Sequence, residues 1–575
     1  DKNRAEIAAL LAQTTPYTWD NLMAPMEVLD EQLHAFWSVI SHLNAVSHSE
    51  ALRVVYEQCL GHLSDYQTDL SHNDTLYQAI ASLKSNQLIF NALTLAQKAV
   101  IDHELRDFKL AGVALSKKDQ HQFSTHTKRL SELGSTFSNH VLDATQAWSY
   151  YTDDLEQLSG LPQSAQDAAH VAAQLKNQEG WLLTLEAPVY IAVMTYADSR
   201  TLREKFYQAY ATRASDQGPN AGRWDNSPII DDVLSHRHKV AQLLGFDHYL
   251  DLSLATKMAA TPDEVEDFLQ TLLAAAFPKA ILELEALSEF AKSHLSLTDL
   301  QVWDVAYASE KLRQEKYAFS QEALRPYFSA PAVIKGLFGV VEKLWGLSIV
   351  EKKDSPSWHD DVQCFAVSDS GGALKSFFYL DLYARKNKRG GAWMDDCRSR
   401  RQLATGEHET PIALITCNFT APIASEPALL THEEVVTLFH EFGHALQHMM
   451  TTVDTVGVAG INGIPWDAVE LASQCLENWA YEKESLQIFA QHYITGECMP
   501  DDLFEKMQRA RYFQSALQMV RQLEFALFDF YLHRDYKPNQ PGLVQTQLDH
   551  IRSQTAVIPV PDYNRFQNGF SHIFA

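Results

Sequence analysis

Residues 431–450 read THEEVVTLFHEFGHALQHMM, and this stretch predicts one helix with a metal-binding face. Thr431 followed three residues later by Glu434 is a capping box, which marks the start of a helix. His440 and His444 are four residues apart, so both imidazoles lie on one face and can reach a single ion. Glu441 can project beside that ion without binding it. This HExxH pattern is typical of zinc peptidases, in which two ligands accompany a general base.

The other faces of the predicted helix are apolar, which indicates that the helix is largely buried. A surface helix with paired histidines is the alternative interpretation. Two buried histidines with a glutamate between them need polar partners, and a metal ion supplies them. Gly443 costs a helix about 1 kcal/mol relative to Ala, so we expect another element to crowd this face. The apolar residues are Val435, Val436, Leu438, Phe439, Phe442 and Leu446.

A catalytic zinc site needs a third protein ligand and one open position for water. The segment PWDAVELASQCLENWAYE (465–482) supplies candidates, because Pro465 opens a second helical pattern. Glu470 and Glu477 are seven residues apart and share a face. Either can reach the metal while the other orients a ligand histidine, although a solvated helix face is the alternative for both. Asp467 is more typical of a helix cap than of a ligand.

The connection TTVDTVGVAGINGIP (451–465) joins the two predicted helices, and Gly457, Gly460 and Gly463 recur in it every three residues. One interpretation is a flexible loop that admits substrate and then closes on it. The other is an ordinary helix–helix connection with permissive glycines. The sequence favours neither.

Outward from this segment, the chain is dominated by helical patterns. The first 145 residues or so repeat apolar residues at helical spacing, for example in 26–46, 51–70 and 126–148. Alternating apolar and polar residues flank Ser370-Gly371-Gly372 and predict a β-hairpin, and 411–419 (PIALITCNF) predicts another strand. We therefore expect a mainly α fold with a small β-sheet placed just before the HExxH helix.

Composition excludes several classes of protein. The chain has 575 residues, with 73 acidic and 47 basic ones, which gives a formal charge of −26. Proteins that track phosphates use clustered Lys and Arg, so a nucleic-acid partner is disfavoured. The basic cluster Arg385, Lys386, Lys388 and Arg389 is better interpreted as a solvated loop.

Cysteine usage and hydropathy indicate the cellular compartment in which we expect the protein. The six cysteines show no CxxC spacing, which disfavours a disulfide framework and favours a reducing compartment, the cytoplasm. No run of eighteen apolar residues is present, so we expect no membrane span. The N-terminal apolar stretch is too short for a signal peptide.

Four stretches closely resemble the M3 family of zinc oligopeptidases, the thimet oligopeptidase family. The resemblance extends from PYTWDNL near the start to FSHIFA at the end, and so covers nearly the whole chain. The four stretches are HEFGHALQHM, GIPWDAVELASQCLENWAYE, YLDLYARKNKRGGAWMDDC and TRASDQGPNAGRWDNS.

The resemblance implies two largely helical lobes that flank a deep substrate channel, with an N-terminal helical domain in 1–150 and a catalytic region in 151–575. It implies an endopeptidase that cleaves internal bonds of short, unstructured peptides in a narrow channel. The implied cofactor is one Zn²⁺ per chain, and we expect a monomer.

The resemblance also assigns roles to individual residues. It implies that His440, His444 and Glu470 are the zinc ligands and that Glu441 is the general base. It implies that Glu477 contacts a ligand histidine without binding the metal itself. His572 in FSHIFA matches a family histidine that lies near the substrate.

In the family the chain continues past FSHxxA into a glycine- and tyrosine-rich stretch whose tyrosines contact the substrate and the developing oxyanion. Here the sequence ends at Ala575 and starts with Asp1, which implies a fragment that lacks both ends. Loss of one oxyanion donor costs about 10²–10³ in rate. Two alternatives therefore stay open: a dipeptidyl carboxypeptidase of the same family, and a catalytically impaired peptide-binding fragment.

Overall fold

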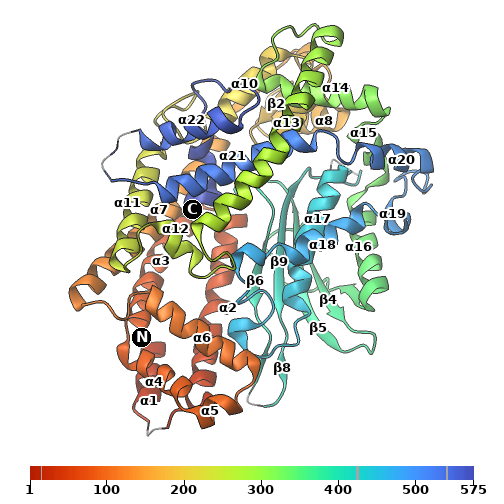
Figure 1. The fold of residues 1–575 in the computed structure, drawn as a ribbon. Coiled ribbons are helices and arrows are strands. Elements are labelled where there is room, and N and C mark those ends of the chain that lie inside the picture. Colours follow the sequence, from red (N-terminus) through yellow and green to blue (C-terminus); the bar gives the residue numbers. More distant parts are fainter. Residues whose placement is uncertain (14–15, 404, 423–425, 539, 541) are drawn as a thin grey trace.

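The computed structural model describes residues 1–13, 16–403, 405–422, 426–538, 540 and 542–575. Helices make up most of these residues, and a five-stranded sheet lies beside helix α17 (Figure 1). The prediction of a mainly α fold with a small sheet near the HExxH helix is confirmed.

Before Ser149, the regular elements among the described residues are all helices, and side-chain caps fix where several of them begin. The Ser49 hydroxyl, for example, accepts a hydrogen bond of 3.1 Å from the backbone N–H of Leu52. Such a cap satisfies one of the donors that the first turn leaves without a partner. The three predicted amphipathic segments correspond to α2, α3 and α7. The helices are α1 (Lys2–Leu11), α2 (Ala24–Val46), α3 (Glu50–Ser71), α4 (Asp74–Ser85), α5 (Gln87–Ala92), α6 (Leu95–Leu110) and α7 (Lys117–Gln146).

A second set of helices begins with α8, which lies in the connection between the paired strands β1 (Ser149–Thr152) and β2 (Trp181–Thr184). The longest of them, α13, packs along α21 from the C-terminal part of the chain, as Figure 1 shows. The helices are α8 (Gln163–Gln174), α9 (Ala187–Tyr196), α10 (Arg200–Ala211), α11 (Ser227–Leu243), α12 (Tyr249–Leu254), α13 (Pro262–His294), α14 (Val305–Tyr317), α15 (Gln321–Leu324) and α16 (Ala330–Trp345).

The five-stranded sheet has the order β3-β4-β5-β9-β6. Only β5 and β9 pair in parallel, with Phe378 opposite Ala413, and the other neighbours are antiparallel. The predicted hairpin at Ser370-Gly371-Gly372 joins β4 to β5 and is confirmed. The strands are β3 (Ser348–Glu351), β4 (Gln363–Ser368), β5 (Leu374–Tyr383), β6 (Trp393–Arg398) and β9 (Ile412–Phe419), and β7 (Arg401–Gln402) and β8 (His408–Glu409) form a separate pair.

Helix α17 (His432–Met449) packs on this sheet and belongs to the largest apolar core. Phe442 of α17 contacts Phe378 of β5 edge to face, with ring centroids 5.3 Å apart. Burial of a side chain of this size contributes about 1.5–3 kcal/mol, so the sheet holds α17 firmly. The remaining helices are α18 (Leu471–Glu477), α19 (Lys483–Phe489), α20 (Asp501–Ala510), α21 (Ser515–Arg534), α22 (Leu543–Thr555) and α23 (Ser571–Phe574).

The basic cluster at 385–389 is only in part the solvated loop that the sequence suggested: Lys386 and Arg389 are exposed, whereas Arg385 and Lys388 turn inward. The Lys388 side chain is fully buried, and its Nζ lies 2.7 Å from the buried carboxylate of Asp381 and 2.6 Å from the carbonyl of Cys417. Arg385 also binds Asp381, at 2.5 Å. A buried charge needs such partners, and this pair joins the end of β5 to β9.

Among the described residues, none of the helices combines the length and the apolar character that crossing a bilayer requires.

Candidate metal centre

The start of α17 is fixed by the predicted capping box. The Thr431 hydroxyl accepts a hydrogen bond of 3.1 Å from the backbone N–H of Glu434, and the Glu434 carboxylate accepts one of 2.7 Å from the N–H of Thr431. These reciprocal bonds set the helical phase. Val435, Leu438, Phe439 and Phe442 are therefore buried, as predicted.

His440 and His444 lie on one face of α17, and the carboxylate of Glu470 meets them there. The Oε2 atom of Glu470 lies 3.2 Å from Nε2 of His440 and 3.2 Å from Nε2 of His444. Ligand atoms of all three residues lie within 4.8 Å of one another. Among the described residues, no other group of three His, Cys, Asp or Glu side chains meets this criterion.

The three residues fit a zinc ion. Tetrahedral zinc with bonds of about 2.0–2.2 Å keeps its ligand atoms roughly 3.3–3.5 Å apart, close to the separations observed here. The tautomer of His440 that donates Nδ1–H to Glu477, at 2.7 Å, leaves a lone pair on Nε2. That lone pair points to the Glu470 carboxylate, at 3.2 Å, so a cation between the two atoms would bind both.

Glu470 reaches this position from the N-cap of α18, not from within a helix. Pro465 does open a helical segment, but as the N-cap of a 3₁₀ turn (Trp466–Ala468), and helix α18 begins only at Leu471. The Ser473 hydroxyl donates a hydrogen bond of 2.7 Å to Oε2 of Glu470 and so orients the carboxylate. Our sequence reasoning missed Ser473, although its position three residues after an N-cap carboxylate is a usable signal.

The assignment of Asp467 to a local cap is also wrong. Its carboxylate accepts hydrogen bonds of 3.0 Å from the backbone N–H groups of Met258 and Ala259, just before α13. Asp467 therefore connects the segment that carries Glu470 to the middle part of the chain.

Gly443 explains how α18 comes close enough to α17. A Cβ atom built on Gly443 would lie 2.6 Å from Cα of Ser473 and 2.7 Å from the carbonyl oxygen of Ala472. These are backbone atoms, which cannot swing aside. The crowding that the sequence suggested on this face is therefore the backbone of α18, two to three residues after Glu470.

Replacing Gly443 with Ala is expected to lower both zinc affinity and stability. Overpacking of this kind typically costs about 1–3 kcal/mol, and the displaced α18 carries Glu470 away from the two histidines. The measurements are the free energy of unfolding and zinc affinity by competition with a chelating dye.

The matched control is Gly61→Ala in α3, where an added Cβ meets nothing within 4 Å. That control is expected to gain up to about 1 kcal/mol from helix propensity and to leave zinc binding unchanged. Equal behaviour of the two variants would contradict the close-contact explanation.

Glu477 touches His440 from behind, on the side away from Glu470. Its Oε1 accepts the Nδ1–H hydrogen bond at 2.7 Å, which fixes the ring orientation and the tautomer. Loss of such an outer partner typically reduces metal affinity about 10–100-fold. Glu477→Ala is therefore expected to weaken zinc binding by this factor without abolishing it, as measured by competition titration. Glu484→Ala, an exposed residue of α19, serves as control, and a complete loss of zinc in Glu477→Ala would identify Glu477 as a ligand.

Glu441 is buried beside the three candidate ligands, with an exposed fraction of 5%. Burial raises the pKa of its carboxyl to about 7; His440 opposes this rise and Glu470 adds to it. A cation bound to the neighbouring residues would lower that pKa again. Glu441 therefore lies where a proton acceptor is needed, next to the metal position.

The glycine-containing connection between α17 and α18 packs against the N-terminal helices. A Cβ on Gly457 would lie 3.1 Å from Val100 of α6, and one on Gly460 would lie 2.8 Å from the carbonyl oxygen of His448. Gly460 and Gly463 have φ values of 65° and 71°, which favour glycine. These close approaches account for all three glycines, and a role in admitting substrate stays a prediction.

His572 lies in α23, on a cavity of about 330 Å³ that Arg385, Lys388 and Arg389 also line. None of the three candidate zinc ligands lines this cavity. The structure thus brings together five of the predicted site residues: His440, Glu441, His444, Glu470 and Glu477. It places His572 on a separate cavity. Its role near the substrate stays a prediction.

Two family models match this chain. Residues 193–575 match peptidase family M3, and residues 1–120 match the N-terminal domain of neurolysin and thimet oligopeptidase.

Individual relatives agree with these matches. The chain is 49% identical over 572 residues to oligopeptidase A of Escherichia coli K12, covering 100% of this chain and 84% of that protein. It is 30% identical to the dipeptidyl carboxypeptidase of the same organism, and this match covers 92% of this chain and 77% of that protein. The solved structure of PZ peptidase A with an inhibitor has the same fold, with a TM-score of 0.60 at 15% identity, covering 100% of this chain and 83% of that one. The chain therefore belongs to peptidase family M3, and it is a metallopeptidase homologous to oligopeptidase A.

Proposed function

We propose that this protein is a zinc-dependent endopeptidase that hydrolyses internal bonds of short, unstructured peptides. The observation that carries the proposal is the convergence of His440, His444 and Glu470 on one point, with the buried carboxylate of Glu441 beside it. Two imidazoles and a carboxylate are the donor set of many catalytic zinc sites, which keep a fourth position open.

Each residue has a distinct task in this proposal. His440, His444 and Glu470 would hold a zinc ion, which supplies Lewis acidity and a bound water of lowered pKa. The Glu441 carboxylate accepts a proton from the attacking water and delivers it to the leaving amine nitrogen. Glu477 accepts the Nδ1–H hydrogen bond of His440 and so orients Nε2 toward the metal position. His572 is the candidate donor to the tetrahedral intermediate.

A quenched-peptide assay with chelation tests the proposal. We expect the purified chain to cleave the peptide, to lose this activity on treatment with a chelator, and to regain it with one equivalent of Zn²⁺. Turnover that survives removal of the metal would refute a zinc mechanism. Tight peptide binding without turnover, with zinc present, would instead support the alternative of a peptide-binding fragment.

The runner-up activity is a dipeptidyl carboxypeptidase, which requires a free C-terminal carboxylate on its substrate. The higher identity to oligopeptidase A, 49% against 30%, supports the endopeptidase. Cleavage of a C-terminally amidated peptide at an internal bond separates the two activities. Release of dipeptides from free acids alone would overturn the endopeptidase proposal.

We further propose a monomer with one zinc ion, active in the cytoplasm, with a domain boundary near residue 150. All three ligands come from one chain, so the site needs no second copy. All six cysteines are free thiols, which suits a reducing compartment.

A further inference from the structure

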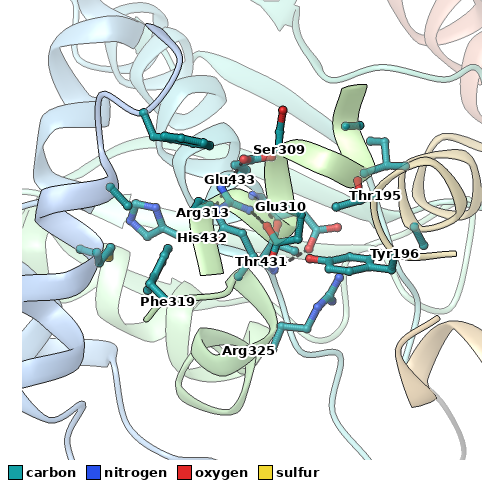
Figure 2. A pocket seen from close by; sticks show the side chains of 18 of the residues that line it. Thr195, Tyr196, Ser309, Glu310, Arg313, Phe319, Arg325, Thr431, His432 and Glu433 are labelled. Atoms are coloured by element: carbon teal, nitrogen blue, oxygen red, sulfur yellow. Dashed lines mark hydrogen bonds and ion pairs between the residues drawn. The ribbon is translucent and has the colours of Figure 1, made fainter. Parts of the chain in front are cut away.

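A cavity of about 720 Å³ begins one helical turn from the metal centre. Thr437 and Glu433 of α17 line it, and they continue the helix face that carries His440 and His444. Helices α9 and α14 form the opposite wall. Figure 2 shows side chains from these elements, among them Tyr196, Glu310 and Arg313, gathered around this cavity.

Three arginines line the cavity, and two of them are neutralised by carboxylates. Arg313 forms an ion pair with Glu310, and Arg325 forms one of 2.7 Å with Glu322. The third, Arg511, has no carboxylate within 4.0 Å among the described residues.

Arg511 is held in place by contacts that leave its charge uncompensated. Its guanidinium lies over the ring of Tyr481, 4.0 Å from the centroid, and its Nη2 donates a hydrogen bond of 3.4 Å to Oδ1 of Asn478. A planar guanidinium with free N–H groups is suited to bind a carboxylate in bidentate geometry.

Two carboxylates on this wall also lack an ion pair within 4.0 Å among the described residues: Glu434 closes the capping box with Thr431, and Glu433 is stabilised differently. It lies in the first turn of α17, where the positive end of the helix dipole favours a carboxylate. Gln321 also donates to it, at 3.4 Å. Glu433 therefore does not cancel the charge of Arg511.

Arg511 is offset from the metal centre along the axis of α17. Tyr481, under Arg511, also packs against His432, with ring centroids 4.7 Å apart. His432 precedes His440 by eight residues, which corresponds to about 12 Å of helix. An extended peptide rises about 3.3 Å per residue, so this offset along the axis of α17 corresponds to roughly three to four residues.

We propose that Arg511 anchors a substrate carboxylate, three to four residues from the scissile bond. The carboxylate is either the peptide C-terminus or the side chain of an Asp or Glu. This inference rests on the proposed peptidase function and specifies its substrate class: short peptides with a negative charge at that distance.

The test compares three peptides of one sequence with the same cleavable bond. The first ends in a free carboxylate at the spanning distance, the second carries Asp at that position within a longer, amidated peptide, and the third is amidated and neutral. For Arg511→Gln we expect kcat/KM to fall about 10–100-fold, mainly through KM, on one or both acidic peptides. The neutral peptide is expected to change less than about twofold, and Arg511→Lys should restore part of the loss. The acidic peptide that responds identifies the source of the carboxylate.

Arg509→Gln is the matched control, because Arg509 is exposed on α20 and does not line the cavity. An equal loss on all three peptides, or no loss on any, would overturn the role of Arg511. Failure of the wild type to cleave any of the three peptides, with zinc bound, would instead refute the proposed function. Melting temperatures of all variants guard against misfolding as the cause of a uniform loss.

Discussion

Replacing Glu441 with Gln is expected to abolish nearly all peptide hydrolysis while one zinc ion stays bound. The amide is isosteric with the carboxylate but cannot accept the proton of the attacking water. Loss of a positioned general base typically lowers the rate about 10²–10⁴-fold. The measurements are kcat on a quenched peptide and the zinc content of the dialysed protein.

Stability gives a second measurement for this variant. Burial raises the pKa of Glu441 to about 7, so the ionised side chain is disfavoured where it lies. Glutamine carries no charge and removes that cost, and we expect no decrease in melting temperature. Substantial residual activity would refute the role of Glu441 as the base. Loss of zinc together with activity would show that Glu441 helps to hold the metal.

Replacing Glu470 with Ala is expected to remove the metal itself. Its Oε2 is the one carboxylate atom 3.2 Å from both Nε2 atoms, so the two histidines would be left with two water positions. The loss of zinc affinity should exceed the roughly 10–100-fold expected for Glu477→Ala. Hydrolysis should fall in parallel and recover only partly at high Zn²⁺.

The comparison of Glu470→Ala with Glu477→Ala separates the ligand from its neighbour. Competition titration on both variants, with Glu484→Ala as control, measures zinc affinity directly. If Glu477→Ala lost zinc and Glu470→Ala kept it, the assignment of the two glutamates would be reversed. Both variants should keep the melting temperature of the zinc-free wild type, because neither side chain is buried in the core.

Much of the catalytic helix could be predicted because its information is local. The capping box at Thr431 and Glu434 depends on a spacing of three residues, and the pairing of His440 with His444 depends on helical periodicity. The hairpin around Gly371 is equally local. These predictions are all confirmed by the structure.

Predictions that depended on partners distant in the sequence were less successful. Asp467 was expected to cap its own helix and instead binds the backbone 208 and 209 residues earlier in the chain. Lys388 was expected in solvent and instead lies buried against Asp381 and Cys417. No pattern in the neighbouring residues reports such contacts, because they arise only when separate elements pack.

The sequence by itself determined His440 and His444 as candidate ligands, Glu441 as the candidate base, and two glutamates as candidates for the third ligand. Only the tertiary structure decided which imidazole nitrogens each glutamate meets. Gly443 lets the backbone of α18 approach α17, and at that separation Glu470 meets the Nε2 atoms while Glu477 reaches Nδ1 of His440. Residue spacing along one helix specifies a face, whereas the distance between two helices depends on the packing of both against the rest of the molecule.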